Sequence, residues 1–141
     1  MSACVNLYRG KRKDNGEWVF GAALPHDNRD EITIFRQNPG TGALEGFEVE
    51  PKTVGMCSGL CDNTELHIIC VGDIHEWRDK GAVKRSVAKF GTFFDIEYEH
   101  DCYGWYFETL NGDCYCFENR EHEYVTIVGN IHDNPELLEV E

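Results

Sequence analysis

Two Asn-Gly dipeptides constrain the fold of this chain more than any other feature of its sequence. Asn15-Gly16 lies within residues 7–21, and Asn111-Gly112 lies between two short aromatic-rich segments, residues 103–110 and 114–117. Asn and Gly both tolerate the positive φ values of a two-residue hairpin turn, so each dipeptide predicts two antiparallel strands joined by a tight turn. Alternation places Trp18 and Phe20 on one face of the strand after the first turn, and we expect Trp18 to lie in the core.

Further short apolar segments lie between polar turns and predict additional strands. They cover residues 31–36, 47–50, 66–71, 82–90, 93–101, 103–110, 114–117 and 124–128. Residues 82–90 also fit a short helix, although a strand is favoured. Near the end of the chain, Asn134 as N-cap and Pro135 at the first helical position predict a short helical turn. Eight or nine strands with almost no helix indicate a mainly β fold, either a small barrel or a sandwich.

The length and composition favour one domain. A chain of 141 residues is about the size of one ordinary domain, and it contains no repeat and no Pro/Ser-rich linker. The first residues form no apolar run of signal-peptide length, and no segment is apolar enough to span a bilayer. We therefore expect a cytoplasmic protein without a membrane partner.

Negative charge is concentrated in the last third of the sequence. The net charge is −13, and residues 93–141 account for −12 of it, with thirteen acidic residues against Arg120 alone. Such a surface repels nucleic acid phosphates, so direct nucleic-acid binding is not expected. The charge fits a solvated acidic face, a surface for a basic partner or a nucleic-acid mimic.

The most regular alternation in the chain places four acidic residues in series. Asp95, Glu97, Glu99 and Asp101 alternate with Phe94, Ile96 and Tyr98, which predicts one strand with an acidic face. Neighbouring carboxylates on one face would lie about 7 Å apart, a spacing that could suit a divalent cation or hydrolysis. A solvated strand face is the simpler interpretation, and this ladder is the predicted interaction surface.

Seven cysteines are numerous for this length, and their odd number means that disulfides cannot use them all. Without a secretion signal, reduced thiols or a metal site are expected rather than a disulfide framework. A turn predicted between Cys57 and Cys61 could form one half of a zinc site, followed by His67, Cys70 and His75. A second combination is Cys102, Cys114 and Cys116 across the Asn111-Gly112 turn. Reduced thiols are favoured, so no cofactor is expected, and structural zinc is the alternative.

Three stretches together resemble the YopX family of phage and prophage proteins. They are YRGKRKDNGEWVFG at 8–21, the pair VEPKTVG at 49–55 and SGLCDN at 58–63 followed by VGDI at 71–74, and TIVGNIHDNPELLE at 126–139. They span nearly the whole chain in the order of the family. The cysteines at 57, 61 and 70 stand where such proteins carry polar or aromatic residues, which argues against a family-wide role for them.

The resemblance implies a mainly β fold that contains a small SH3-like barrel. On this basis residues 1–141 form a single YopX-like domain, with an N-terminal β-hairpin part at about 1–54 and a barrel part at about 55–141, ended by the short helical turn. We interpret the motif residues as fold determinants at turns, bends and packing contacts: Gly16, Trp18, Gly55, Gly59, Gly72, Asp73, Gly129, Asn134 and Pro135.

No catalytic residue is predicted. The chain has no G-x-S-x-G nucleophile motif, and the NPGTG segment at 38–42 lacks the Lys-Ser/Thr of a phosphate-binding loop. The resemblance supplies no established activity. The leading hypothesis is a noncatalytic phage or prophage accessory protein in the cytoplasm of a bacterial host, which binds a host or phage protein or forms a homo-oligomer. The alternatives are a nucleic-acid mimic or nucleic-acid-linked protein and a metal-dependent enzyme.

Overall fold

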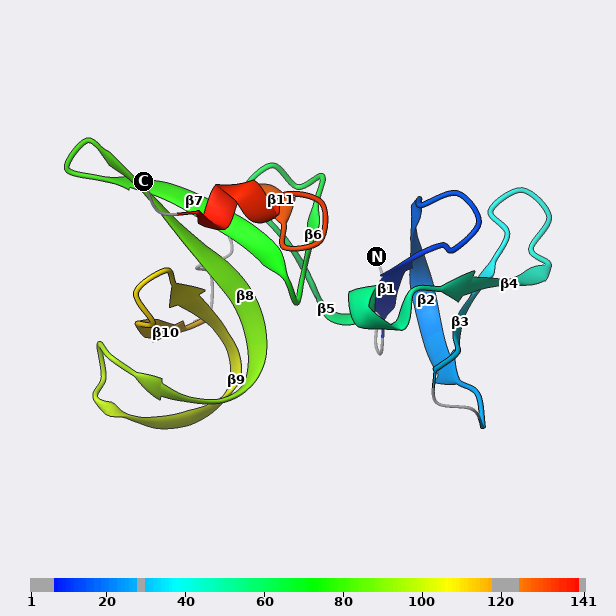
Figure 1. The fold of residues 1–141 in the computed structure, drawn as a ribbon, viewed down its shortest axis with the longest axis horizontal. Coiled ribbons are helices and arrows are strands. Elements are labelled where there is room, and N and C mark those ends of the chain that lie inside the picture. Colours follow the sequence, from blue (N-terminus) through cyan, green and yellow to red (C-terminus); the bar gives the residue numbers. More distant parts are fainter. Residues whose placement is uncertain (1–6, 28–29, 118–124, 140–141) are drawn as a thin grey trace. The chain divides into compact units, whose positions relative to one another are not determined.

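The computed structural model describes residues 7–27, 30–117 and 125–139. The described residues form strands and short 3-10 helices, which confirms the mainly β fold. The chain divides into two compact units, Met1–Gly59 and Leu60–Glu141, at a boundary a few residues beyond the predicted 54/55 division. Figure 1 shows the elements of both units.

The first unit is a sheet of antiparallel neighbours in the order β4-β3-β2-β1-β5. The end of β4 also meets the end of β1, where the Glu50 N–H donates to the Lys11 carbonyl at 2.8 Å. A 3-10 helix at Pro51–Thr53 (η1) leads from β4 into β5. The strands are β1 (Tyr8–Lys11), β2 (Trp18–Pro25), β3 (Ile32–Gln37), β4 (Leu44–Val49) and β5 (Gly55–Cys61), whose last residues belong to the second unit.

The core of the first unit lies on the opposite face of β2 from the one predicted. Val19, Ile34 and Val49 are almost fully buried and pack together. Trp18, the expected core residue, is only half-buried, and the guanidinium of the buried Arg9 lies 4.7 Å from the centre of its ring. The prediction for Trp18 was wrong because its side chain lies on the face of β2 that points away from the core. There the Arg9 guanidinium, and not the core, covers part of the large ring.

The first hairpin turn is longer than the predicted two-residue turn. The Arg12 N–H donates to the Glu17 carbonyl at 2.8 Å, so residues 13–16 form a four-residue loop. Gly16 takes a positive φ of 73°, and Asn15 instead accepts a hydrogen bond from the Glu17 N–H through its side chain. The second turn has three residues, as the predicted strands 103–110 and 114–117 imply, but it begins one residue earlier, because the Thr109 N–H donates to the Asp113 carbonyl.

The second unit contains a sheet in the order β10-β9-β8-β7-β11. The long β8–β9 hairpin dominates it, and an additional parallel pairing joins β10 to the end of β8 at Cys114 and Asp95. A buried cluster of Ile69, Ala88, Phe107 and Val125 forms its core. The strands of this sheet are β7 (Asp73–Asp79), β8 (Ala82–Asp95), β9 (His100–Thr109), β10 (Cys114–Cys116) and β11 (Ile127–Asn130). The short strand β6 (Ile68–Cys70) also lies in the second unit but is not part of this sheet. The Tyr124 start predicted for the last strand lies outside the described residues.

Two glycines facing each other across the hairpin mark its bend. Gly91 of β8 lies opposite Gly104 of β9, with φ values of 149° and 147°. A residue with a Cβ rarely adopts this backbone conformation, although nothing within 4 Å would contact a Cβ at either site. Figure 1 shows β8 and β9 curving together around β10. The end of β8 therefore reaches β10 and pairs with it, in addition to the pairing of β10 with β9.

The segment predicted as the most regular strand is instead the tip of this hairpin. β8 ends at Asp95, residues 96–99 form the turn, and β9 begins at His100 opposite Asp95. The Glu99 N–H donates to the Asp95 carbonyl at 2.8 Å, and Glu99 has a positive φ of 56°. The prediction was wrong because a hairpin turn can carry the same alternating residues when a side chain, here Asp95, holds it.

The described residues form two sheets and no closed barrel, so the SH3-like barrel implied by the family resemblance is not confirmed. Pro135 opens the final turn as predicted, but this turn is a 3-10 helix, η3 (Pro135–Leu138), and not an α-helix. Asn134 makes no side-chain capping bond to it.

Candidate binding pocket

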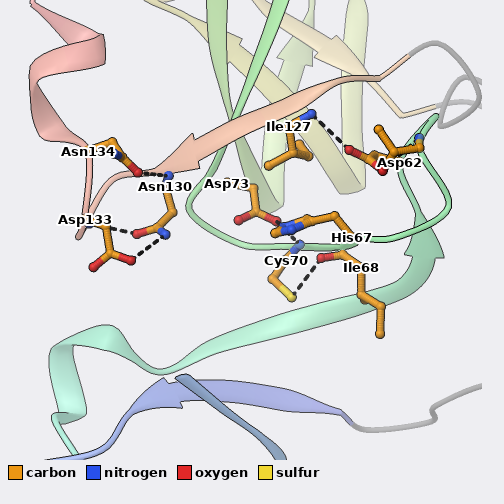
Figure 2. Close-up of polar contacts among 10 residues, drawn as sticks. Asp62, His67, Ile68, Cys70, Asp73, Ile127, Asn130, Asp133 and Asn134 are labelled. Atoms are coloured by element: carbon orange, nitrogen blue, oxygen red, sulfur yellow. Dashed lines mark hydrogen bonds and ion pairs between the residues drawn. The ribbon is translucent and has the colours of Figure 1, made fainter. Parts of the chain in front are cut away.

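Residues of two of the sequence motifs described above, at 71–74 and 126–139, lie together where β7 pairs with β11. Asp73 lies opposite Asn130 in the strand register and is completely buried. Its Oδ2 accepts hydrogen bonds from the Cys70 N–H at 2.7 Å and from His67 Nε2 at 3.0 Å (Figure 2). Asp73 therefore closes the turn between β6 and β7, which is a structural task.

Asn130 and Asn134 order the segment that follows β11. The Asn130 side-chain oxygen accepts hydrogen bonds from the N–H groups of His132 and Asp133, both at 2.9 Å. Asn134, predicted as a helix cap, instead accepts the Asn130 N–H at 3.2 Å through Oδ1 (Figure 2). A Cβ on Gly129 would lie 2.4 Å from that oxygen, so this glycine allows the close approach that the sequence predicted.

The other predicted motif glycines differ in their backbone conformation. Gly59 and Gly72 have φ values of 80° and 95°, as expected at bends, whereas Gly55 lies in β5 without a positive φ. The Gly72 carbonyl also accepts the Ile131 N–H at 2.9 Å. Together with Asp73 and Asn134, these residues hold turns and strand ends.

The predicted acidic ladder does not form one face. Asp95 is 1% exposed and accepts hydrogen bonds from the Tyr98 N–H at 2.7 Å and from the Cys116 N–H at 2.6 Å. Burial raises the pKa of the Asp95 carboxyl, but these N–H groups lower it by more, so its pKa lies below the ordinary value. Asp95 is therefore a buried acceptor of backbone hydrogen bonds and not a surface charge.

The remaining acids of the ladder share the hairpin tip with exposed aromatic rings. Glu97, Glu99 and Asp101 are all exposed. Phe94, Ile96 and Tyr98, predicted to share the face opposite the acids, are 55%, 43% and 48% exposed, and Tyr103 is 76% exposed. We call the exposed residues Phe94, Ile96–Glu99, Asp101 and Tyr103 the hairpin surface. It combines carboxylates with apolar rings.

The cysteines do not form the predicted zinc half-site. Cys57 and Cys61 lie on the same strand, β5, without the turn expected between them, so a regular strand would separate them by about 13 Å. Cys57 and Cys70 are both disulfide-bonded, which departs from the reduced thiols expected. Cys61 is a free thiol.

The second combination of cysteines also lacks a metal-binding arrangement. Cys102 lies opposite Phe93, while Cys114 and Cys116 face other residues of β9. Burial raises the pKa of the Cys102 and Cys114 thiols, and neighbouring carboxylates add to the effect, which disfavours the thiolate that zinc binds. Within residues 7–27, 30–117 and 125–139, no three His, Cys, Asp or Glu side chains could hold a metal ion together.

A pocket of about 920 Å³ lies in the second unit, a size typical of ligand sites. Side chains of β7, β8, β9 and β10 line it, and the hairpin tip contributes Glu97. Its lining mixes aromatic and charged groups with one buried hydroxyl. The lining residues include His75, Trp77, Asp79, Lys84, Ser86 and Asp113.

An aromatic wall forms one side of the pocket. The His75 and Trp77 rings of β7 are stacked with centres 5.1 Å apart and an angle of 19°, and the Phe107 ring lies 5.3 Å from His75. Burial lowers the pKa of the His75 imidazole more than its hydrogen bond to the Thr126 backbone raises it, so the ring is neutral at pH 7. The wall therefore carries little charge of its own.

Ser86 is the most buried polar residue among those that line the pocket. It lies on β8 directly opposite His75 of β7 and Thr109 of β9, and it is 1% exposed. Its Oγ is buried and has no hydrogen-bond partner in the part of the chain that the structure describes. An unpartnered buried hydroxyl costs about 1–3 kcal/mol, so a ligand that bonded to it would recover part of this free energy.

Three carboxylates and two cations also line the pocket. Asp79, Glu97 and Asp113 supply negative charge. Arg85 is held by Glu76 at 2.9 Å and donates to the Leu137 carbonyl at 3.2 Å, so its charge is already compensated. Lys84 is exposed opposite Trp77, and the acids outnumber it.

Sequence reasoning did not find this pocket. His75 was noted only as a zinc ligand, and Trp77 and Ser86 had no assigned role. One signal was present, because His75, Trp77 and Asp79 alternate on one strand and therefore share a face. The strands β8 and β9 complete the pocket. The tip of their hairpin was predicted as a strand, so the pairing of β8 with β9 could not be predicted.

The fold and the pocket together define a small, mainly β protein of two units, the second of which contains a pocket lined by acidic and aromatic residues. No helix of the described residues has the length and apolar character needed to cross a membrane. The chain belongs to the YopX family, because the model described as YopX protein matches residues 7–139. No curated protein and no solved structure matches the chain.

Proposed function

We propose that this protein is a noncatalytic phage or prophage accessory protein that binds a basic segment of a host or phage protein in the bacterial cytoplasm. The observation that carries the proposal is the hairpin surface, where Tyr103 and Tyr98 are exposed beside Glu97, Glu99 and Asp101. Carboxylates attract Lys and Arg, and aromatic faces bind the same cations. Exposed aromatic rings are also enriched at protein interfaces.

The charge distribution favours the second unit as the binding unit. Residues 60–141 contain 18 acidic and 6 basic residues, whereas residues 1–59 contain 8 and 7. A net charge of −12 would speed the encounter with a basic partner and make it depend on ionic strength. In the first unit, the basic residues near β1 are largely compensated, with Arg12 paired to Asp14 at 2.7 Å and Lys13 to Glu48 at 3.4 Å.

The geometry around Ser86 argues for binding and against nucleophilic catalysis. A serine nucleophile needs a base within hydrogen-bond distance. His75 faces Ser86 across the strands, but its Nδ1 interacts with the backbone of Thr126 at 3.2 Å, and Ser86 Oγ has no partner among the described residues. The arrangement therefore fits a pocket that recognises a ligand.

A partner pull-down from the phage-bearing host tests the proposal. The tagged chain is compared with a triple variant, Glu97→Lys, Glu99→Lys and Asp101→Lys, at low and physiological salt. We expect the variant to capture at least tenfold less partner than the wild type. The amount captured by the wild type should fall as the salt concentration rises. The matched control makes the same charge change elsewhere on the second unit, at Glu65, Glu136 and Glu139, and should retain the partner. Equal capture by all three proteins would refute the proposal.

A nucleic-acid mimic is the second candidate, because the acidity of the second unit also resembles that of a phosphate backbone. This function predicts that the protein displaces DNA from a basic DNA-binding protein and that the captured partner is such a protein. Capture of a second copy of the chain would instead indicate self-association through the exposed rings.

A further inference from the structure

A stacked pair of aromatic rings, a buried hydroxyl and several carboxylates line the pocket of the second unit. The rings of His75 and Trp77 are stacked on each other, so a flat ligand can lie against an outer face of this stack. Ser86, on the neighbouring strand, is among the lining residues, is 1% exposed, and its Oγ has no partner in the described ranges. A ligand that uses all three features must be flat, must form hydrogen bonds and must tolerate carboxylates.

The carboxylates exclude anionic ligands. Asp79, Glu97 and Asp113 come from β7, the hairpin tip and the β9–β10 turn, so they approach the pocket from three elements. Lys84 is the one lining cation that no other described residue pairs with, and its side chain is exposed. A phosphate or carboxylate ligand would therefore meet more repulsion than attraction.

We propose that the pocket accepts the side chain of an arginine from the basic partner segment. A guanidinium is planar and cationic, and it carries five N–H donors. It can lie against the Trp77 ring, donate to Ser86 Oγ and face the lining carboxylates at the same time. The chain already uses the first of these contacts, since the Arg9 guanidinium lies 4.7 Å from the Trp18 ring centre.

Arginine fits this lining better than the other candidates of similar size. A lysine ammonium is a compact charge without a flat face, and a neutral aromatic side chain would leave Ser86 and the carboxylates without a donor. This inference rests on the proposed function and adds to it the partner residue and the place where it binds. The hairpin surface and the pocket share Glu97, so one segment could use both.

NMR titration of the full chain with N-acetyl-arginine methylamide tests the inference directly. We expect chemical-shift changes at the Trp77 indole N–H and at the backbone N–H groups of His75 and Ser86. Citrulline in the same derivative has the shape of arginine without its charge and should bind at least tenfold more weakly. The lysine derivative should also bind more weakly than arginine.

Two variants separate the contacts. Ser86→Ala removes an unpartnered hydroxyl, so it should fold at least as stably as the wild type while its affinity for the arginine derivative falls about tenfold. Trp77→Leu should lower the affinity by a similar factor. Thr92→Ala, on the same strand but outside the pocket lining, is the control and should bind as the wild type does.

Several results would overturn the arginine site. These are equal binding of arginine and citrulline, shifts confined to the hairpin surface, stronger binding of a neutral aromatic derivative, or an unchanged affinity of Ser86→Ala. The proposed function fails separately. If the pull-down retains its salt-sensitive partner and the arginine titration shows no pocket shifts, the protein binds a basic partner without this site. If arginine enters the pocket but the triple-lysine variant captures the partner normally, the hairpin surface is not the interface.

Discussion

Asp95 holds the tip of the β8–β9 hairpin, and its replacement by asparagine tests how much the tip depends on it. The carboxylate accepts the Tyr98 N–H through Oδ1 and the Cys116 N–H through Oδ2. Asparagine has the same shape but a single acceptor oxygen, so Asp95→Asn keeps one of these bonds, without its charge, and loses the other.

The expected cost follows from the two bonds. A hydrogen bond to a charged group contributes about 1.5–3 kcal/mol, so losing one bond and weakening the other should lower the free energy of unfolding by about 3 kcal/mol. The pKa of Asp95 lies below its ordinary value because the backbone donors outweigh burial. Its contribution is therefore complete above the pKa of an unfolded aspartate, about 3.9, and is lost as the pH falls through the folded pKa.

Urea unfolding at pH 7, followed by circular dichroism, measures this difference, and amide hydrogen exchange at Cys116 locates it. The stability gap between wild type and Asp95→Asn should narrow as the pH falls below about 4, where Asp95 of the unfolded chain binds a proton, and should be lost once the folded carboxylate is protonated at lower pH. Asp101→Asn, an exposed acid on the same hairpin, should stay within about 0.5 kcal/mol of the wild type. If Asp95→Asn matches Asp101→Asn and the Cys116 N–H keeps its protection, the reasoning about the turn is refuted.

Three further substitutions probe other parts of the fold. Gly21→Ala would place a Cβ 2.1 Å from the Phe35 carbonyl oxygen and should cost about 3 kcal/mol in urea unfolding, while Gly40→Ala should be near neutral; equal midpoints would contradict this close approach. Phe107→Ala should cost about 3–5 kcal/mol, because this residue is 7% exposed in the second core, and a cost below 1 kcal/mol would argue against its packing there. Asp62→Asn should speed hydrogen exchange at the Ile127 N–H, which donates to the Asp62 carboxylate at 3.2 Å; unchanged exchange would show that this bond does not hold β11.

Local chemistry made the strands and turn positions predictable, but not which faces are buried. Pro51 ends β4 and Asn111-Gly112 joins β9 to β10, because a missing N–H and a positive φ act within a few residues. The buried face of β2 depends on partners distant in sequence, and Val19 is buried because it packs with Ile34 and Val49. Periodicity alone does not decide whether the face of β2 that carries Trp18 or the face that carries Val19 is buried.

The candidate site was less predictable because its parts converge only through register. The acidic series was predicted as one strand face because the same alternation of acidic and apolar residues can occur in a strand and in a hairpin turn. The sequence pattern does not distinguish a strand from a turn that one of its own side chains holds. The donors to Asp95 include the Cys116 N–H, which is twenty-one residues away, and no local pattern reports such a bond. Likewise, Ser86 joins His75 only through the pairing of β7 with β8. Gly129 in β11 and Asn134 after it were predictable as structural residues, although the bond between Asn134 and the Asn130 N–H was not.

The opposed glycines Gly91 and Gly104 have a consequence for how this family member can drift in sequence. Each allows the same bend, so an alanine at either position would oppose the curvature of both strands. Once one alanine has straightened the hairpin, the second has less bend left to disturb, and the double variant should cost less than the sum of the single ones. Such epistasis makes the first replacement the harmful one, so selection would hold the two positions as a pair.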